Sequence, residues 1–281
     1  MVTSLRKMLR GFLLLGTFLG AASVGGRPGE AAVRSVPLTR VVHIRSVALG
    51  PQDTGQTAKP NADTVLVSPG GQDELPEGPD GFDVLDDGSF LLTDPLRRRI
   101  AIFSSQGAFL REWRIDFAAD SVTVTPSGAV LVREASTGDL HAFDREGKSR
   151  PNEGIALPQP AEARLLTPNS GSVARPGGGV IQVQFNVPGL RLLSLESLTT
   201  DAGGNTYVAL ESTAGGAADE GINLNKYVRK YSADGKLVCE IAGIPLDYYV
   251  RPVDELRVHK GVVYQLMTTN SEVRINVWDT K

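Results

Sequence analysis

Short apolar stretches alternate with turn-forming residues along residues 81–115. The apolar stretches read GFDVL, SFLLT, RIAIF and AFLREWRI, and clusters of Asp, Gly, Pro and Ser lie between them. Stretches of about five residues separated by such turns predict a four-stranded antiparallel meander. No apolar stripe of helical length follows residue 24, so we expect little helix.

The meander pattern repeats along the chain, with starts at residues 81, 121, 197 and 255, which are 40, 76 and 58 residues apart. The interval of 76 fits two units, so we expect a degenerate copy between residues 160 and 196, with its clearest strand at residues 180–185. The interval of 58 is explained by an insertion at residues 212–225. A period near 40 residues with four strands per unit is typical of β-propeller blades. The predicted fold is therefore all-β, a β-propeller of five or six four-stranded blades, and residues 50–80 leave that number open.

The last copy of the repeat lacks its fourth strand, because the sequence ends at Lys281. Residues 40–49 read RVVHIRSVAL and supply a strand that belongs to no copy. We expect residues 41–49 to pair with residues 272–279 as the outer strand of the last blade. This pairing would close the ring and protect its exposed sheet faces.

The first copy resembles the NHL repeat. In residues 86–94 a turn with Asp and Gly leads to a strand that ends in Asp, and Arg99-Ile100, Phe103 and Gly107 follow. The later copies match in part. The resemblance implies a propeller, which in that family typically has six blades. It implies little about activity, because this architecture hosts binders, lyases, lactonases and scaffolds.

The N-terminal residues indicate where the protein works. Three basic residues precede the apolar run GFLLLGTFLGAA at residues 11–22, and small residues follow. This pattern predicts a secretory signal peptide over residues 1–23, with the β-propeller domain at residues 24–281. A cut after Ala31 also fits. The run is shorter than the ~20 residues that span a membrane, which favours cleavage over anchoring. We expect an exported protein, periplasmic or extracellular, with no transmembrane anchor after cleavage.

Charge and cysteine content narrow the classes of partner. The chain has 29 Lys and Arg against 32 Asp and Glu, and loss of the three basic residues before residue 23 takes its net charge from −3 to −6. A negative exported protein is not expected to bind nucleic acid through bulk charge. The single cysteine, Cys239, cannot close an intramolecular disulfide and is expected to be a small buried residue.

The sequence contains no catalytic motif that we can assign, so no catalytic residue and no metal ligand are predicted. The candidate ligand-binding residues are Asp94, Glu134 and Glu211, each at or near the end of the second strand of its unit. In a ring these carboxylates would occupy equivalent places and could converge at one end of the channel, where they would bind a ligand or act as acid and base. Alternatively, each carboxylate stabilises its own turn.

Two charged stretches have plain structural interpretations. Seven carboxylates occur between residues 73 and 87 without a Lys or Arg, a composition that could serve calcium. Their spacing matches no EF-hand loop, because Phe82 stands where a ligand is required, so we expect a solvated acidic loop and no cofactor. The members of this acidic stretch are Asp73, Glu74, Glu77, Asp80, Asp83, Asp86 and Asp87.

The basic run at residues 97–99 is expected to pair with local carboxylates on a solvated edge.

Two functions fit these features. The first is an exported, non-enzymatic β-propeller that binds a protein, peptide or glycan, or that acts as a scaffold, through loops on one face. The second is a metal-dependent hydrolase or lactonase of the propeller type, which would use carboxylates that line the channel.

Overall fold

The computed structural model describes residues 33–50, 61–70, 75–151, 161–176, 178–214, 223–250 and 252–281. Residues 33–281 form one compact unit, and the predicted signal peptide lies outside the described residues. The only helix in the described part is the three-residue 3₁₀ helix η1 (Pro95–Arg97), so the expected scarcity of helix is confirmed. No helix in that part is long and apolar enough to cross a membrane.

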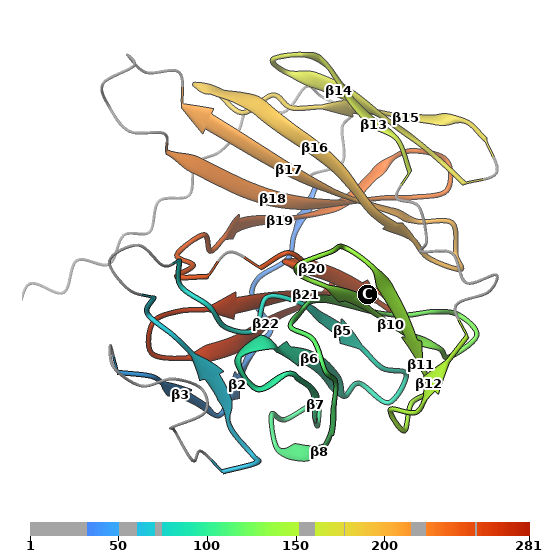
Figure 1. The fold of residues 1–281 in the computed structure, drawn as a ribbon. Coiled ribbons are helices and arrows are strands. Elements are labelled where there is room, and N and C mark those ends of the chain that lie inside the picture. The colour runs from blue at the N-terminus through green and yellow to red at the C-terminus, as the bar shows by residue number, and fades with distance from the viewer. Residues whose placement is uncertain are drawn as a thin grey trace, which may run out of the picture. The chain divides into compact units, whose positions relative to one another are not determined.

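The protein is built from small antiparallel meanders that follow one another along the chain (Figure 1). The first sheet comprises β5 (Phe82–Val84), β6 (Phe90–Asp94), β7 (Arg99–Phe103) and β8 (Phe109–Arg114). The second sheet comprises β9 (Ala119–Val124), β10 (Val130–Glu134), β11 (Leu140–Phe143) and β12 (Ser149–Arg150). The first sheet lies within the predicted residues 81–115, and the second begins at Ala119, two residues before its predicted start at residue 121.

The third sheet contains the degenerate copy of the repeat. It has three strands, β13 (Ala163–Thr167), β14 (Ser170–Ala174) and β15 (Val180–Gln184), and β15 is the strand that the sequence made clearest. The fifth sheet contains β20 (Leu256–His259), β21 (Val262–Thr268) and β22 (Val273–Asp279).

The fourth sheet departs from prediction in the length of its first hairpin. Its strands are β16 (Leu190–Thr200), β17 (Thr206–Ala214), β18 (Leu224–Tyr231) and β19 (Leu237–Ile244). The first strand begins seven residues before the predicted start at residue 197, because residues 190–196 pair with the end of β17. The predicted insertion at residues 212–225 is therefore shorter at both ends.

The N-terminal segment binds to two sheets. Strand β2 (Arg40–Ile44) lies antiparallel to β22 in the fifth sheet, with Arg40 opposite Val277 and Ile44 opposite Val273. The predicted pairing is thus present, but only through residue 44. Strand β3 (Ser46–Ala48) leaves the sheet and pairs in parallel with β4 (Val65–Val67). Upstream, β1 (Arg34–Ser35) adds in parallel to the edge of the fourth sheet.

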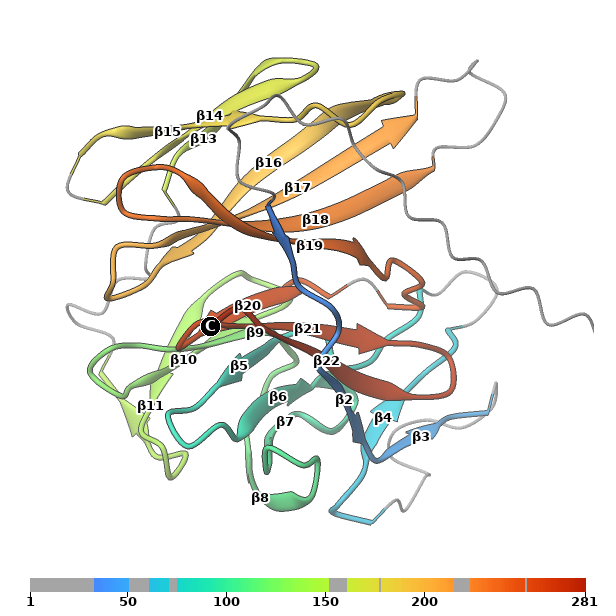
Figure 2. The same cartoon turned by 180° about the vertical axis from the view of Figure 1, so that it is seen from behind.

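Four buried apolar clusters lie between the sheets and hold them together. They join the second sheet to the first, the first to the fifth, the fifth to the fourth and the fourth to the third. Figures 1 and 2 show the fourth sheet beside the fifth, with β13–β15 on its other side. Within the described residues no such cluster joins the second sheet to the third, so closure into a ring is not seen there. Representative members from the two sides of each cluster, in the order given, are Trp113 and Val130, Phe82 and Ile275, Trp278 and Tyr207, and Leu210 and Phe185.

Glycine permits the close contact between the first two sheets. Gly147, in the turn between β11 and β12, has a φ of +85°, and a Cβ atom added there would lie 2.3 Å from Cγ of Trp113 on β8. The turn can therefore cover the indole only because this residue has no side chain. Cys239 is 1% exposed within the cluster between the fourth and fifth sheets, as predicted.

We expect Gly147→Ala to destabilise the protein by about 2–4 kcal/mol, because it adds a steric clash with Trp113 to the cost of a left-handed backbone. Gly138→Ala is the matched control, since Gly138 also has a positive φ, +76°, but its added Cβ atom would meet nothing within 4 Å. The control should lose only about 1 kcal/mol. Urea unfolding of both variants measures the difference, and equal losses would contradict the proposed packing role.

Candidate functional site

Asp94, the first predicted site residue, lies at the buried end of β6. The Arg99 Nε donates to its Oδ2 at 2.7 Å, and both side chains are almost inaccessible to solvent. Burial raises the pKa of Asp94, and the guanidinium of Arg99 opposes that shift. Arg99 also binds Glu112 and the carbonyl of Thr64. The predicted pairing with carboxylates is therefore confirmed for Arg99, although its solvated edge is wrong, whereas Arg97 and Arg98 donate to backbone carbonyls instead.

Glu134 and Glu211 have partners of their own. Ser136 Oγ donates to Glu134 at 2.7 Å, and His141 Nε2 lies 3.3 Å from its second oxygen. Glu211 Oε1 forms an ion pair with Lys226 Nζ at 3.0 Å. The predicted residues thus lie in separate sets of contacts on three sheets. Among the described residues no group of three or more His, Cys, Asp or Glu side chains is arranged to hold a metal ion.

The structure brings together a different set of carboxylates, on the strands that begin the sheets. We call β5, β9, β16 and β20 the inner strands. β5 contacts both β9 and β20, and β16 contacts β20. An acidic residue lies at or near the start of β5, β9 and β20, and another lies within β16. Each of the four stands two positions before an apolar residue of its strand. These residues are Asp80, Asp120, Glu196 and Asp254, which precede Phe82, Val122, Leu198 and Leu256.

Asp254 connects the fifth sheet to the second. Its Oδ2 accepts hydrogen bonds from Ser121 Oγ at 2.8 Å and from the backbone N–H of Val122 at 3.1 Å. Its Oδ1 pairs with Arg257 Nη2 at 2.6 Å. The backbone N–H of Asp254 also donates to the carbonyl of Asp80 at 3.0 Å. The carboxylate of Asp254 thus links β20 to β9, and its backbone N–H links the start of β20 to the start of β5.

Arg257 and Asp83 complete these connections. Arg257 Nε donates to the carbonyl of Phe82 at 3.0 Å, and Nη2 lies 3.4 Å from the carbonyl of Val122. Asp83 Oδ2 accepts from the backbone N–H of Val124 at 2.6 Å. Burial raises the pKa of Asp83, and Arg257 opposes that shift. Side chains at β5 and at the start of β20 thus bond to the backbone of neighbouring inner strands.

Gly81 allows β5 and β9 to approach each other. A Cβ atom at this position would lie 2.7 Å from both the carbonyl oxygen of Asp120 and the Cα of Ser121. The two strands are in direct backbone contact here, so the acidic groups at their starts are forced close together.

The carboxyl group of Asp80 is strongly perturbed. Burial, with a smaller contribution from the carboxylates of Asp120 and Asp254, raises its pKa from 3.8 to about 7. The hydrogen bond from Thr93 Oγ1 to Asp80 Oδ1, 3.0 Å long, acts in the opposite direction. Asp120 is satisfied by Arg133, whose Nε and Nη2 donate to its two oxygens at 2.8 and 3.1 Å.

A second group of charges continues the set toward the fourth sheet. Lys226 Nζ is buried between Glu211 and Glu255, and it binds both carboxylates. Gln265 Nε2 also donates to Glu255, at 3.2 Å. Glu196 is solvent-exposed, yet desolvation by its surroundings and the charges of Glu211 and Glu255 raise its pKa, against the effect of Lys226. Glu211 is therefore the one predicted site residue that borders this region.

We name these residues the inner-strand cluster. Seven carboxyl groups meet three cationic side chains, so the cluster has a formal excess of negative charge. Groups of like charge raise one another's pKa and favour a cation at their edge. The carboxyl groups belong to Asp80, Asp83, Asp120, Glu196, Glu211, Asp254 and Glu255, and the cations are Arg133, Lys226 and Arg257.

A pattern of acidic residues in the sequence marks this cluster, although we did not predict the cluster from it. Each of the four predicted repeat starts, at residues 81, 121, 197 and 255, is preceded directly by an acidic residue. The expectation that the stretch from residue 73 to residue 87 is a solvated loop is correspondingly wrong for Asp80 and Asp83, which are half-buried. It holds for Asp86 and Asp87, which are exposed, whereas Asp73 and Glu74 lie outside the described residues.

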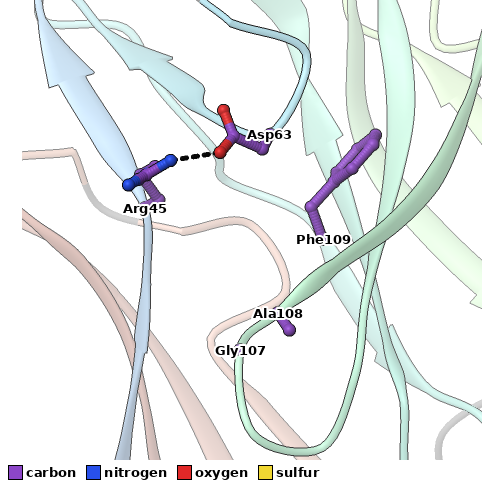
Figure 3. Close-up of a pocket in the computed structure, with 5 residues that line it drawn as sticks. All are labelled: Arg45, Asp63, Gly107, Ala108 and Phe109. Atoms are coloured by element: carbon purple, nitrogen blue, oxygen red, sulfur yellow. Dashed lines mark hydrogen bonds and ion pairs between the residues drawn. The ribbon is translucent and has the colours of Figure 1, made fainter.

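A separate hollow of about 330 Å³ lies beside β3 and β4 (Figure 3). Arg45, Asp63, Gly107, Ala108 and Phe109 line it. The guanidinium of Arg45 binds the carboxylate of Asp63, so the two charges that the hollow offers are paired with each other. The hollow therefore presents less unbalanced charge than the inner-strand cluster.

We expect Asp80→Asn to stabilise the protein at alkaline pH. Because the folded-state pKa of Asp80 is raised to about 7, folding stability falls as pH rises from about 4 to about 7, and the penalty is complete above that range. Asn keeps an oxygen for Thr93 and removes the charge, so the gain at pH 8 should be roughly 1–3 kcal/mol. Urea unfolding from pH 4.5 to 8.5 should show a flatter profile for the variant.

Asp86→Asn is the control for this experiment. Asp86 is exposed, and a hydrogen bond from Lys260 lowers its pKa, so the sign of its contribution is opposite. Loss of this charge should give no stabilisation at pH 8. A parent-like profile for Asp80→Asn would show that Asp80 does not carry the penalty.

Comparison with known proteins gives no family assignment. No family model matches the chain, and no curated protein matches it. Among solved structures, the chain is similar to virginiamycin B lyase from Staphylococcus aureus, with 11% identity over 74% of this chain and 85% of that chain and a TM-score of 0.32. It is also similar to a DUF4221 family member from Bacteroides vulgatus (10% identity, 69% and 75% coverage, TM-score 0.29) and to Hsv2 from Kluyveromyces lactis (10%, 67% and 71%, 0.31). These neighbours are propeller-like proteins, none of them identifies an NHL repeat, and likenesses at this level transfer no activity.

Proposed function

We propose that this chain is an exported, non-enzymatic β-propeller that binds a protein or peptide partner at the end where the inner strands begin. The five sheets are its blades, with NHL-like repeats, and β2 completes the fifth blade. The observation that carries the proposal is the inner-strand cluster, in which four strands from four sheets each place a carboxyl group in the same region.

The chemistry of the cluster favours a cationic group as its ligand. Desolvation raises the pKa values of Asp80 and Glu196, and the neighbouring carboxylates of the cluster raise them as well. A lysine or arginine side chain of a partner would relieve this repulsion and form charge-assisted hydrogen bonds. The exposed carboxyl group of Glu196 provides a first contact.

The same contacts favour binding over hydrolysis. Asp254 and Asp83 accept hydrogen bonds from backbone N–H groups of the neighbouring sheet, and Asp120 accepts from Nε and Nη2 of Arg133. These carboxylate oxygens already accept hydrogen bonds that hold the strands in place. A propeller hydrolase would need inward carboxylates directed at one point, where a metal ion or a substrate could lie.

The proposal is tested with an arginine-containing peptide, acetyl-Gly-Arg-Gly-Arg-Gly-amide, in calorimetric titrations at low salt. The double variant Asp80→Asn with Glu196→Gln should bind the peptide about tenfold more weakly, because two carboxylates that face the ligand are neutralised. Both groups have raised pKa values, so their neutralisation should leave the fold intact.

The matched control is Glu146→Gln with Asp234→Asn, which removes the same charge from exposed turns of the second and fourth sheets. This variant should bind like the parent. Equal losses in the two double variants would mean that only net charge matters, and would contradict a site at the inner strands. Stoichiometric bound Ca²⁺, Mn²⁺ or Zn²⁺ in the purified protein, found by elemental analysis, would favour the hydrolase instead.

Export is the second part of the proposal and has its own test. The basic and apolar segments before Ser23 support it. Intact-mass analysis of the protein from its producing cells should show a chain that starts at Val24 or, with the alternative cut, at Ala32. A cell-associated chain that retains residues 1–23 would contradict cleavage.

A further inference from the structure

In the described part of the chain, the third sheet carries no fourth strand at its outer edge. The first, second and fifth sheets have four strands and the fourth has five, whereas β13–β14–β15 ends at β15. Among the residues that the structure describes, no strand pairs with the outer side of β15. This edge is distinct from the inner-strand cluster and plays no part in the proposed function.

The hydrogen bonds around β14 and β15 show which backbone groups of β15 point outward. The N–H of Phe185 donates to the carbonyl of Asn169 at 2.8 Å, and the N–H of Ala174 donates away from β15, to the carbonyl of Glu162. Residues 181 and 183 therefore bond to β14, and residues 180, 182 and 184 direct their N–H and C=O groups to the open side. The guanidinium of Arg229 accordingly reaches the carbonyl of Gln184 from the outer side.

The side chains of β15 suit pairing with another strand. Ile181 and Val183 are buried against the fourth sheet, and Val180, Gln182 and Gln184 are exposed on the opposite face. The strand reads VIQVQ and contains no charged residue.

The other four outermost strands differ in this respect. Strands β1, β2, β8 and β12 each carry at least one arginine. Charged side chains on an edge strand oppose its pairing with another chain. The third sheet is therefore the one whose outer strand, within the described part of the chain, lacks this protection.

We propose that β15 pairs antiparallel with β15 of a second copy of this chain across a two-fold axis at Gln182. In this register Gln182 lies opposite Gln182 of the second copy and Val180 opposite Gln184, so all three outward-facing residues form hydrogen-bonded pairs. Gln184 can still accept the bond from Arg229, because a carbonyl oxygen has two lone pairs. The two third sheets become one continuous six-stranded sheet.

Lack of charge is what makes the strand self-complementary. Across a two-fold axis at Gln182 the central residue meets its own copy, so a charged residue there would face a like charge, which opposes pairing. The neutral amide of Gln182 instead both donates and accepts hydrogen bonds. The contact area of one strand pair is small, so we expect a dimer that dissociates in the micromolar to millimolar range.

The test is sedimentation equilibrium of the full chain from about 1 μM to about 1 mM. The parent should shift from monomer to dimer across this range. Gln182→Lys should weaken the dimer by about tenfold or more, because two lysines face each other. Gln106→Lys, an equal charge change in the exposed turn between β7 and β8, should leave the dimer unchanged.

A charge-pairing experiment makes the assignment specific. Gln182→Glu alone should also dissociate, and an equimolar mixture of Gln182→Glu and Gln182→Lys should recover dimers at parent concentrations. A parent that stays monomeric up to the highest concentration, as it would if another segment of the chain or a different protein covers β15, overturns the proposal. A dimer that Gln182→Lys does not weaken overturns it as well. Neither result bears on the peptide titrations, which probe the inner strands.

Discussion

A sheet of three or four short strands has two faces and cannot bury both of them alone. Each sheet of this protein solves the problem by packing against neighbouring sheets, and the four apolar clusters between sheets are the result. A buried aromatic residue such as Phe82 contributes about 1.5–3 kcal/mol in such a cluster, and no single sheet could collect enough of these contributions. The N-terminal strands follow the same rule, because β2 adds to the fifth sheet and β1 to the fourth.

Face-to-face packing has a consequence at the inner strands. When their starts converge, backbone groups of one sheet lie within reach of side chains from the next. Asp83 and Asp254 serve as acceptors for N–H groups of β9, and Arg257 serves as a donor for the carbonyl of Phe82. The carboxyl groups that align the sheets therefore also accumulate in one place, where burial, together with repulsion from Asp120 and Asp254, raises the pKa of Asp80. A structural device and a candidate binding surface arise from the same residues.

The outer strands face the opposite problem, since an edge with unsatisfied backbone groups attracts other strands. Arginine on four of the outermost strands is the usual protection against such pairing. The neutral sequence of β15 is an exception. Inner and outer edges of the sheets thus offer two chemically different surfaces, one rich in carboxylates and one rich in unpaired backbone groups.

Local sequence determined the strands and their order. Alternating apolar residues and turn glycines mark strands such as β6 and β7 within a residue or two, because strand and turn preferences depend on neighbours in the chain. The repeat period predicted even the weak third sheet, and the unpaired strand near the N-terminus predicted its contact with β22. The prediction failed at the start of β16. Both strands of the β16–β17 hairpin can continue at their open ends, and only the observed pairing between them shows that they do.

Only the tertiary structure decided which polar residues act together. Asp94, Glu134 and Glu211 hold equivalent places in the repeat, yet each is directed to partners of its own sheet or loop, because side-chain direction depends on what packs beside the strand. Asp80 and Asp83 look like members of a solvated acidic loop in sequence, and their burial follows from the approach of β9 and β20. Charge and hydropathy are properties of single residues, whereas burial and pairing depend on segments that are far apart in the chain.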